Sequence, residues 1–270
     1  MDRIGSPGAA LKVRSAALER WTSDEIMTIV GSRSIRDGSS CFVGIGIPST
    51  VVNLARATHA PNVTLVYESG PIGAKPQVLP LSIGDGELSA TADTVVSIPE
   101  MFNYWLQGGN IDMGYLSAAQ IDRLANLNST VIGSRYADPT VRLPGAGGAP
   151  NVAAFCKAVT VIMRHQSRAF VRAVDFVTSV GFGPTDGYRE SLGLTGRGPT
   201  TVITDLGILE PDPHHRELTL VAVHPGVTVD MVRDRTQWEL RVADDIGETS
   251  PPTETELEAV RSLVHAGSAS

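Results

Sequence analysis

Short apolar runs and helical spacings of apolar residues alternate along most of the chain. The run 41–47 predicts a buried strand that ends at Pro48, and Ser49 is expected to cap a short helix after it. The run 63–67 is rich in β-branched residues and predicts a second strand. Further strands are expected at 93–97, 159–163 and 174–177, extended segments at 113–121 and 129–133, and helices at 99–106 and 152–158.

Two helix starts carry a capping signature. Thr22 is followed three residues later by Glu25, and Thr253 is followed in the same way by Glu256. The hydroxyl and the carboxylate of such a pair each accept a backbone N–H that the helix itself leaves unpaired. We therefore expect a first helix after Thr22 and a final amphipathic helix after Thr253.

The last third of the chain has a different texture. Apolar runs at 201–204, 207–209 and 218–223 flank the turn 211–215, a pattern typical of antiparallel hairpins. Strands that alternate with helices elsewhere imply a mainly parallel sheet covered on both faces. The chain is therefore predicted to be an α/β protein, with a loose N-terminal arm over 1–20 and one domain over 21–270.

Composition places the chain among globular proteins. Of the 270 residues, 42% are hydrophobic and 19% are charged, which excludes a disordered chain. No apolar run reaches about 18 residues and no signal-peptide pattern opens the sequence, so neither a membrane span nor secretion is expected. The net charge of −7 and the scattered arginines argue against nucleic-acid binding.

The cysteines and histidines suggest no chemistry of their own. Cys41 and Cys156 lie in apolar stretches without a ligand at metal-site spacing, so we expect buried free thiols in a cytoplasmic protein without a bound metal. His59, His165 and His224 lack the i,i+4 partner of a helical zinc site. Serine hydrolase and P-loop chemistry are excluded because neither G-x-S-x-G nor a Walker sequence is present.

Glu68 comes directly after the apolar run 63–67 and before a Gly-Pro turn. A carboxylate at that place lies at a strand end, where the ligands of open α/β sheets collect. Two interpretations stand. Glu68 is either a surface charge paired with a basic group, or a partly desolvated base or nucleophile.

Two glycine-rich turns are the other candidate sites. Gly44 and Gly46 lead from the predicted strand into a helix start, but Ser49 replaces the third glycine of a dinucleotide-binding fingerprint. A turn whose backbone approaches a substrate is therefore favoured there. The loop 143–151 precedes a helix, and its unshielded N–H groups suit an oxyanion. A need for positive φ explains those glycines equally well.

Several segments, taken in order, resemble one known family. The sequence Tyr-Glu-Ser-Gly-Pro-Ile-Gly at 67–73 is similar to the E-S-G motif of glutaconate-type class I CoA-transferase β subunits. Further similar segments are A-Q-I-D at 119–122, N-L-N-S-T at 126–130, the glycine loop at 145–149, the run 174–179 and H-P-G-V at 224–227. Together they extend over about residues 44–232.

The resemblance implies a three-layer α/β/α sandwich with the CoA-transferase (NagB/RpiA-like) fold, and a covalent mechanism. Glu68 would attack the acyl-CoA thioester to form a mixed anhydride, and CoA would then convert it to a glutamyl-CoA thioester. An acceptor carboxylate would reverse these steps. Coenzyme A is then a substrate, and no tightly bound cofactor is expected.

The resemblance also assigns site residues. The main-chain N–H of Gly147 or of Gly148 is expected to stabilise the oxyanions. Alanines at 118 and 125 stand where glycines are usual in the family. Substrate contacts are expected from Gly44, Gly46, Ser69, Gly70, Asn103 and Gln120.

An α subunit is implied as well, with the site at the junction of the two chains and an α2β2 or larger assembly. The isolated chain should then be inactive, and its substrates are acyl-CoA and carboxylic acids. One alternative is a CoA-thioester hydrolase subunit of the same fold, acting on a ring-opened steroid or aromatic catabolite. Another is a non-catalytic ligand-binding or scaffold subunit. The acyl group is not identified by the residues.

Overall fold

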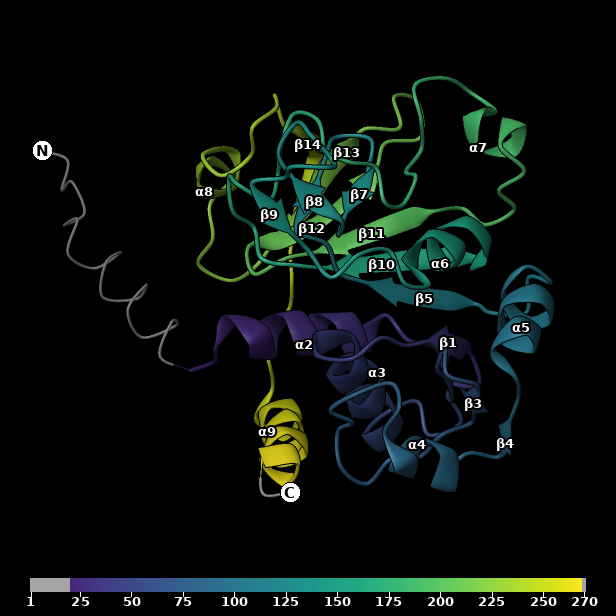
Figure 1. Cartoon of the computed structure of the whole chain (residues 1–270). Coiled ribbons are helices and arrows are strands. Elements are labelled where there is room, and N and C mark those ends of the chain that lie inside the picture. Colours follow the sequence, from purple (N-terminus) through teal and green to yellow (C-terminus); the bar gives the residue numbers. More distant parts are fainter. Residues whose placement is uncertain (1–19, 269–270) are drawn as a thin grey trace, which may run out of the picture.

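The computed structural model describes residues 20–268, which are built around one large sheet (Figure 1). The neighbours from β11 to β2 run parallel, and antiparallel pairs are added on both flanks. The mainly parallel sheet is therefore confirmed. In spatial order its ten strands are β14 (Arg241–Glu248), β13 (Leu218–Val223), β12 (Gly207–Pro211), β11 (Pro199–Ile203), β10 (Ala158–Ile162), β5 (Met113–Leu116), β1 (Ser40–Phe42), β2 (Thr64–Val66), β3 (Pro71–Ile72) and β4 (Thr94–Val95).

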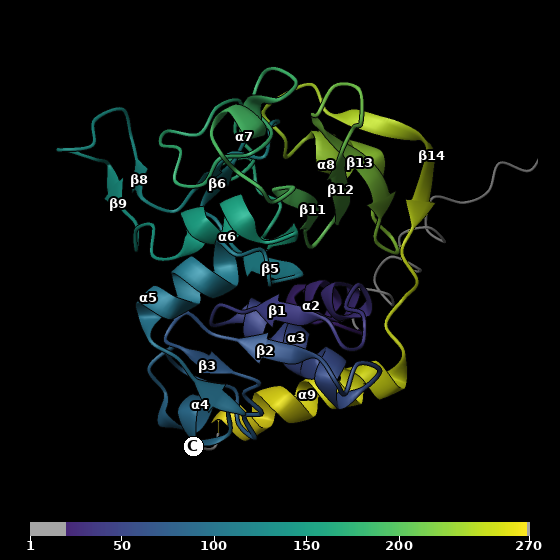
Figure 2. The ribbon, with the colours of Figure 1, turned by 90° about the vertical axis from the view of Figure 1, so that its right-hand side faces the viewer.

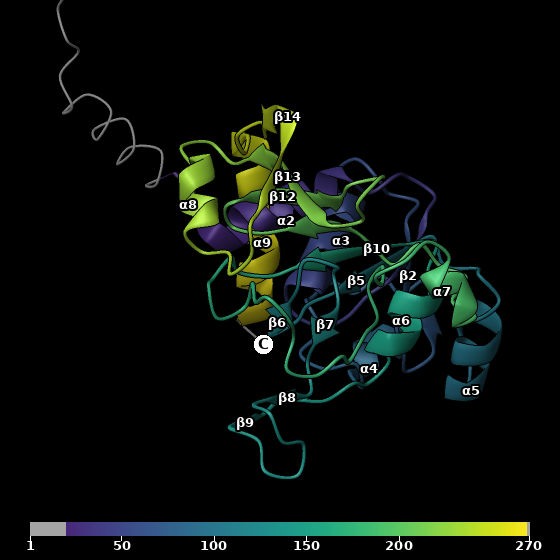
Figure 3. The same ribbon diagram turned by 90° about the horizontal axis from the view of Figure 1, so that it is seen from above.

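Two small hairpins and the helices complete the described fold. One hairpin pairs β6 (Gln120–Ile121) with β7 (Leu127–Asn128), and the other pairs β8 (Val131–Ile132) with β9 (Val141–Arg142). The hairpin of β8 and β9 projects from the body (Figures 2 and 3). The helices are α2 (Ser23–Arg33), α3 (Ile47–Ala57), α4 (Gly86–Ala90), α5 (Ile98–Glu100), the π-helix η1 (Met101–Leu106), α6 (Ala149–Phe155), α7 (Tyr188–Ser191), α8 (Val229–Arg233) and α9 (Glu254–Ser268).

Alternating side chains of the central strands separate two layers of hydrophobic core. In β1, Cys41 packs in a cluster with Met27 of α2 and Val51 of α3, whereas Phe42 packs in a cluster with Val152 of α6. Helices α2 and α3, with α9 packed on them, therefore cover one face, and α6 and η1 cover the other (Figure 1). The predicted three-layer α/β/α sandwich is confirmed.

Both predicted capping boxes are present. The hydroxyl of Thr22 accepts the N–H of Glu25 (3.2 Å), and the Glu25 carboxylate accepts the N–H of Thr22 (2.6 Å). Thr253 and Glu256 exchange the same two bonds at 3.3 and 2.8 Å. Arg33 at the end of α2 also donates two bonds of 2.7 Å to the Glu256 carboxylate, which fastens α9 to α2.

The predicted strand over 41–47 is wrong beyond Phe42, and so is the predicted cap at Ser49. Strand β1 ends at Phe42, Gly46 takes a φ of 84° as the N-cap of α3, and Pro48 lies in the first helical turn. Proline suits that turn because its nitrogen has no proton that needs a partner. Ser49 is instead buried inside the helix.

Residues 174–177 form a loop, so the strand predicted there is wrong. Asp175 accepts the N–H of Gly133 (2.8 Å), and its own N–H donates to the side chain of Gln120 (3.0 Å). The backbone N–H of Asp175 is therefore paired with a side chain, and its carboxylate with the residue after β8, so neither forms the backbone ladder of a strand. Residues such as valine favour strands because they pack well on a half-buried pleated surface. Val177 is 47% exposed, so this preference does not act on it here.

The antiparallel strands predicted in the last third are confirmed. Strand β11 pairs with β12 and β12 pairs with β13 across the turn after Pro211. The predicted arm over 1–20 lies, apart from Arg20, outside the described residues. Within 20–268, none of the helices combines the length and the apolar character that crossing a bilayer requires.

Candidate active site

Glu68 lies in the tight turn that joins β2 to β3. The N–H of Gly70 donates to the carbonyl of Tyr67 (3.0 Å), and the N–H of Tyr67 donates to the carbonyl of Pro71 (3.0 Å). These bonds close a four-residue turn with Glu68 at its second position. The Glu68 side chain is half-buried, so the turn presents a carboxylate at the end of a buried strand.

The two residues after Glu68 hold this turn. Gly70 takes a φ of 115°, and a β-carbon there would meet the carbonyl oxygen of Val96 at 2.0 Å, so only glycine fits. The hydroxyl of Ser69 donates to the carbonyl of Ile83 (2.5 Å). Ser69 and Gly70 are both expected as substrate contacts. In the structure they contact Ile83 and Val96, and these contacts fix the turn that carries Glu68.

Tyr67 fastens the end of β2 to α3 directly below the turn. Its ring is fully buried, and its hydroxyl lies 3.4 Å from the hydroxyl of Ser49. Asn53, one helical turn further on, donates to the carbonyl of Ser49 (2.9 Å). Burial raises the pKa of Tyr67, so the phenol keeps its proton.

Gly44 and Gly46 lie at the same edge of the sheet as Glu68. Strands β1 and β2 run parallel with Phe42 opposite Val66, so the residues that follow both strands emerge together. Ligands of open parallel sheets collect at this carboxyl edge. Within the described part of the chain, no heavy atom other than those of the glycine and its two chain neighbours lies within 4 Å of a β-carbon built on either glycine. The space beside them is therefore open to a substrate.

The glycine loop meets Glu68 at Gly148. The N–H of Gly148 donates to Oε2 of Glu68 at 3.2 Å. A β-carbon on Gly148 would lie 2.6 Å from that oxygen and 3.0 Å from the ring of Phe102. The φ of Gly148 is −82°, which any residue adopts, so the contact with the carboxylate and the ring explains this glycine.

The earlier residues of the loop do need positive φ. Gly145 has a φ of 108° and Gly147 a φ of 50°. Ser129 holds this part of the loop, because its carbonyl accepts the N–H of Gly145 (2.9 Å) and its hydroxyl donates to the carbonyl of Gly145 (2.8 Å). The need for positive φ therefore explains Gly145 and Gly147, and the close contact with the carboxylate and the ring explains Gly148.

Phe102 completes the contact, and sequence reasoning does not single it out. It lies on η1, its ring borders Gly148, and it meets the ring of Phe42 edge-on with 6.4 Å between centroids. In the sequence Phe102 has the spacing of an ordinary core residue. Only the register of the π-helix, which no local signal predicts, turns it toward the glycine loop.

Asn103 and Gln120 are not hydrogen-bonded to Glu68 within the described residues. Asn103 is exposed on η1. Gln120 is buried, and its side-chain oxygen accepts bonds from the amide of Asn128 (2.8 Å) and the N–H of Asp175 (3.0 Å). The position of Gln120 is thus that of a scaffold residue that joins strand β7 to the loop at Asp175.

The A-Q-I-D segment keeps a glycine-type turn although alanine stands at 125. Ala125 takes a φ of 59°, and its N–H donates to the carbonyl of Asp122 (2.9 Å). The Asp122 carboxylate accepts the N–H groups of Leu124 and Asn126 at 3.0 Å each. Burial raises the pKa of Asp122. Ala125 therefore adopts the left-handed conformation that glycine favours.

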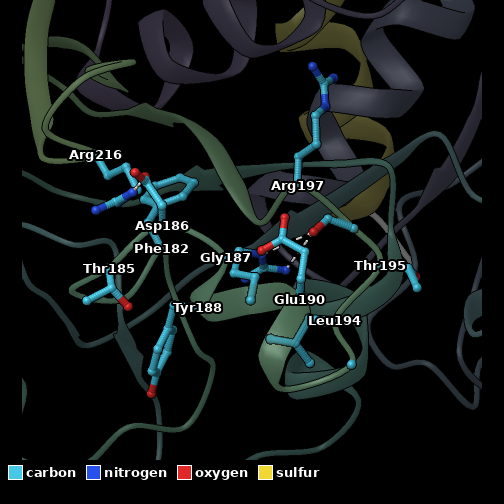
Figure 4. Close-up of a pocket in the computed structure, with 13 residues that line it drawn as sticks. Phe182, Thr185, Asp186, Gly187, Tyr188, Glu190, Leu194, Thr195, Arg197 and Arg216 are labelled. Atoms are coloured by element: carbon cyan, nitrogen blue, oxygen red, sulfur yellow. Dashed lines mark hydrogen bonds and ion pairs between the residues drawn. The ribbon is translucent and has the colours of Figure 1, made fainter.

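A separate hollow of about 650 Å³ lies around α7 (Figure 4). Asp186 and Arg216 form an ion pair at its wall. The buried guanidinium of Arg189 donates to the carbonyls of Gly196 (3.1 Å) and of Ala153 in α6 (2.7 Å). None of the lining residues belongs to the Glu68 turn or the glycine loop, so this hollow lies outside the candidate site.

The chemistry available at Glu68 is that of a carboxylate next to a main-chain donor. Nucleophilic attack and proton transfer are the two reactions that such a group supports. Across residues 20–268 no group of three or more His, Cys, Asp or Glu side chains is placed to hold a metal ion.

Comparisons with known proteins agree with this architecture. The family model for coenzyme A transferase matches residues 25–235. The B-type chain of the 3-oxoadipate CoA-transferase of Pseudomonas knackmussii is 54% identical, covering 91% of this chain and 94% of that one. The B-type chain of the glutaconate CoA-transferase of Acidaminococcus fermentans is 31% identical, covering 92% and 94%.

Solved structures extend the likeness to three dimensions. The crystal structure of the Acidaminococcus fermentans glutaconate CoA-transferase matches with a TM-score of 0.83 at 30% identity, over 90% of this chain and 94% of the solved chain. The cholesterol ring-cleaving hydrolase IpdB subunit of Mycobacterium tuberculosis is more distant, at 25% identity over 90% of this chain and 94% of that one. The matched residues 25–235 include the Glu68 turn and the glycine loop. The chain therefore belongs to the coenzyme A transferase family.

Proposed function

We propose that this chain is the β-type subunit of a CoA-transferase whose covalent nucleophile is Glu68. The enzyme moves CoA between an acyl-CoA thioester and an acceptor carboxylate. The observation that carries the proposal is the hydrogen bond from Gly148 to the half-buried Glu68 carboxylate, at the carboxyl edge of the sheet. A partly desolvated carboxylate is suited to attack a thioester, and the main-chain donor beside it is suited to stabilise the oxyanions that follow.

In the first step an oxygen of Glu68 attacks the carbonyl carbon of the thioester. The carbon–sulfur bond breaks, CoA leaves as a thiolate, and the acyl group forms a mixed anhydride with Glu68. Negative charge develops on the thioester oxygen and needs a donor. We assign the main-chain N–H of Gly147 to it, because Gly147 lies in the same loop and borders open space.

In the second step the thiolate attacks the side-chain carbonyl carbon of Glu68, and the carboxylate product leaves. Charge now develops on an oxygen of Glu68 itself. Oε2 already accepts the N–H of Gly148 at 3.2 Å, so this donor is in place before the charge forms. The glutamyl-CoA thioester then reacts with the incoming carboxylate by the reverse of these steps.

The acceptor we propose is 3-oxoadipate, a dicarboxylic oxo acid. The relative with 54% identity is a 3-oxoadipate CoA-transferase chain, which supports an acceptor of that kind. The open space beside Gly44 and Gly46, next to Glu68, is the part of the acyl site that this chain would supply.

We also propose an α subunit as partner, in an α2β2 or larger assembly. The relatives at 54% and 31% identity are both B subunits of CoA-transferases, which supports a second kind of subunit. The open space beside Gly44 and Gly46, at the same sheet edge as Glu68, supports a site at the junction of two chains. Acyl-CoA and carboxylic acids are then its small-molecule substrates. The buried free thiols of Cys41 and Cys156 support a place in the reducing cytoplasm.

The test is to trap the covalent intermediate on the complex with the α subunit. The complex is mixed with acyl-CoA, treated with borohydride and digested, and the peptide that contains Glu68 is examined by mass spectrometry. Reduction of a glutamyl thioester leaves an alcohol in place of the carboxyl group. The Glu68→Gln complex is the matched control, and absence of the alcohol from the native complex would refute the proposal.

The same complex separates transfer from hydrolysis. A transferase releases little CoA from acyl-CoA until an acceptor carboxylate is added. Steady release of free CoA without an acceptor is the result expected of a hydrolase. Full turnover by the Glu68→Gln complex would instead mean that the chemistry belongs to the partner.

A further inference from the structure

The main chain at Gly148 is the meeting point of a carboxylate and an aromatic ring. A β-carbon there would lie 2.6 Å from Oε2 of Glu68, and 3.0 and 3.1 Å from two ring carbons of Phe102. The carboxylate oxygen and the ring edge therefore both lie close to the backbone of Gly148. On one side of the glutamate is a polar donor, and beside that donor is an apolar ring edge.

The π-helix sets the position of this ring. The N–H of Gln107 donates to the carbonyl of Phe102 (3.0 Å), five residues back instead of four. Met101 and Leu106, at the two ends of η1, are both fully buried and anchor the segment in the core. The half-buried Phe102 ring then rests edge-on against Phe42, at 6.4 Å between centroids. The position of the ring is therefore fixed by its contact with Phe42 and by the two buried residues at the ends of η1.

Covalent catalysis through Glu68 creates a competition with water. In the glutamyl-CoA thioester, a water oxygen can attack the side-chain carbonyl carbon of Glu68. The carbon–sulfur bond then breaks and the Glu68 carboxylate is regenerated, while the CoA thiolate takes up one proton of the water and the other proton goes to solvent. No acyl group is transferred. A transferase therefore needs an apolar wall at this carbon, where a hydrolase needs a path for water.

We infer that Phe102 is the residue that keeps water from the Glu68 carbonyl and so sets the ratio of transfer to hydrolysis. This inference rests on the proposed function, since it assumes a covalent intermediate on Glu68. Phe102 takes no part in the bond changes and acts by its position beside Gly148, so it is a positioning residue. Its ring is the apolar surface that adjoins the donor of Oε2.

The test compares Phe102→Ala with Phe155→Ala in the complex with the α subunit. Phe155 is a matched control, because it is also half-buried and packs on the same core cluster at the far end of α6. Acyl-CoA hydrolysis without acceptor and transfer with acceptor are measured for each complex. The ratio of hydrolysis to transfer should rise about tenfold or more in Phe102→Ala and stay at the native value in Phe155→Ala. Phe102→Leu, which keeps an apolar side chain of moderate size, should give a smaller rise and serves if the alanine variant fails to fold.

Equal loss of both rates in Phe102→Ala or in Phe102→Leu, with an unchanged ratio, would overturn the inference, and so would the same rise in Phe155→Ala. These outcomes leave the proposed function standing, provided that the borohydride product appears on Glu68 of the native complex. Absence of that product from the native complex would refute the proposed function itself, before the variants are compared.

Discussion

The main-chain N–H of Gly148 donates a hydrogen bond to Oε2 of Glu68 across 3.2 Å, and the two residues are 80 positions apart in the sequence. One residue lies in the turn after β2, and the other is the N-cap of α6. The contact therefore depends on two segments that follow different strands and meet only at the carboxyl edge of the sheet. It brings together a group that can attack and a group that can stabilise the charge produced.

Gly148→Ala should reduce transfer about a hundredfold or more and change stability little. The φ of −82° admits alanine, but its β-carbon would lie 2.6 Å from the Glu68 carboxylate and displace it. Transfer rates of the complex and thermal unfolding are the measurements. Gly86→Ala is the control, since its β-carbon meets no heavy atom of the described residues within 4 Å apart from its chain neighbours and its own helix backbone. A native transfer rate in Gly148→Ala would contradict the assigned contact.

Gly70→Ala should lower the free energy of unfolding by about 2 kcal/mol or more. The variant combines a φ of 115° with a β-carbon 2.0 Å from the main-chain oxygen of Val96, which cannot move away as a flexible side chain would. Gly38→Ala isolates the conformational part, because Gly38 has a φ of 76° and open surroundings. Urea unfolding of the chain should show a loss of about 1 kcal/mol for Gly38→Ala. Equal losses at the two positions would mean that the contact with Val96 costs nothing.

The stability of the chain should fall as the pH is lowered from about 6.5 to 5, in part because of His165. The imidazole is buried, stacks on Phe170 at 3.7 Å and lies 2.9 Å from the hydroxyl of Thr236. Burial, with a smaller effect of Arg235, lowers the pKa of His165 to about 3. In this range the unfolded chain binds a proton at His165 that the native chain does not. The stability linked to this group is therefore complete above the unfolded pKa of about 6.5, and it falls steadily as the pH is lowered toward the native pKa of about 3.

Between pH 6.5 and 5 this one group should remove up to about 2 kcal/mol. Urea unfolding at pH 7, 6 and 5 measures the loss, and His165→Gln is the comparison because glutamine does not titrate. The variant should be less stable at pH 7 but should lose less on acidification. Burial also lowers the pKa of His224, so a part of the pH dependence should remain in the variant. Parallel pH curves for the two proteins would show that His165 is not responsible.

The Arg33 and Glu256 pair should contribute about 1 to 3 kcal/mol by holding α9 on α2. Arg33 donates two bonds of 2.7 Å to the carboxylate, which lowers the pKa of Glu256 to about 2. The contribution is therefore present above the unfolded pKa of about 4.5 and is lost as the pH falls toward 2. A double-mutant cycle of Arg33→Gln and Glu256→Gln by thermal unfolding measures it.

The pair of Arg20 and Glu254 is the matched comparison for that cycle. It joins the segment just before α2 to the first residue of α9, with 3.1 Å between the guanidinium nitrogen and the carboxylate oxygen. Its side chains, however, are 66% and 72% exposed. Water and salt screen such a pair, so its coupling should stay below about 0.5 kcal/mol. Similar coupling energies for the two pairs would contradict the role given to Arg33.

Features that close within a few residues could be predicted from the sequence. Both capping boxes formed as expected, since Thr22 with Glu25 and Thr253 with Glu256 need no partner from elsewhere. The Glu68 turn followed the breaking signal after β2 for the same reason. Its glycine at 70 is required by its φ and by a contact with Val96, just after β4, and only the first of these is a local property.

Features that depend on a distant neighbour were predicted poorly. The run 174–177 has the apolar, β-branched character of a strand, but Asp175 binds Gly133 and Gln120 instead of a strand. Ser49 looked like a cap because its type suits one, yet Gly46 takes that position with a φ of 84°. Strand β14 and helix α8 gave too weak an apolar pattern for a prediction, and both are held by packing on the late strands.

The order of apolar and polar residues alone determined the class of this protein, the parallel core with later antiparallel strands, and a carboxylate at a strand end. Those properties follow from periodicity and turn chemistry, which act over a few residues. Folding alone decided that Gly148 meets Glu68 and that the Phe102 ring lies beside Gly148, because a hydrogen bond across 80 positions and the register of a π-helix are set by the packing of whole elements.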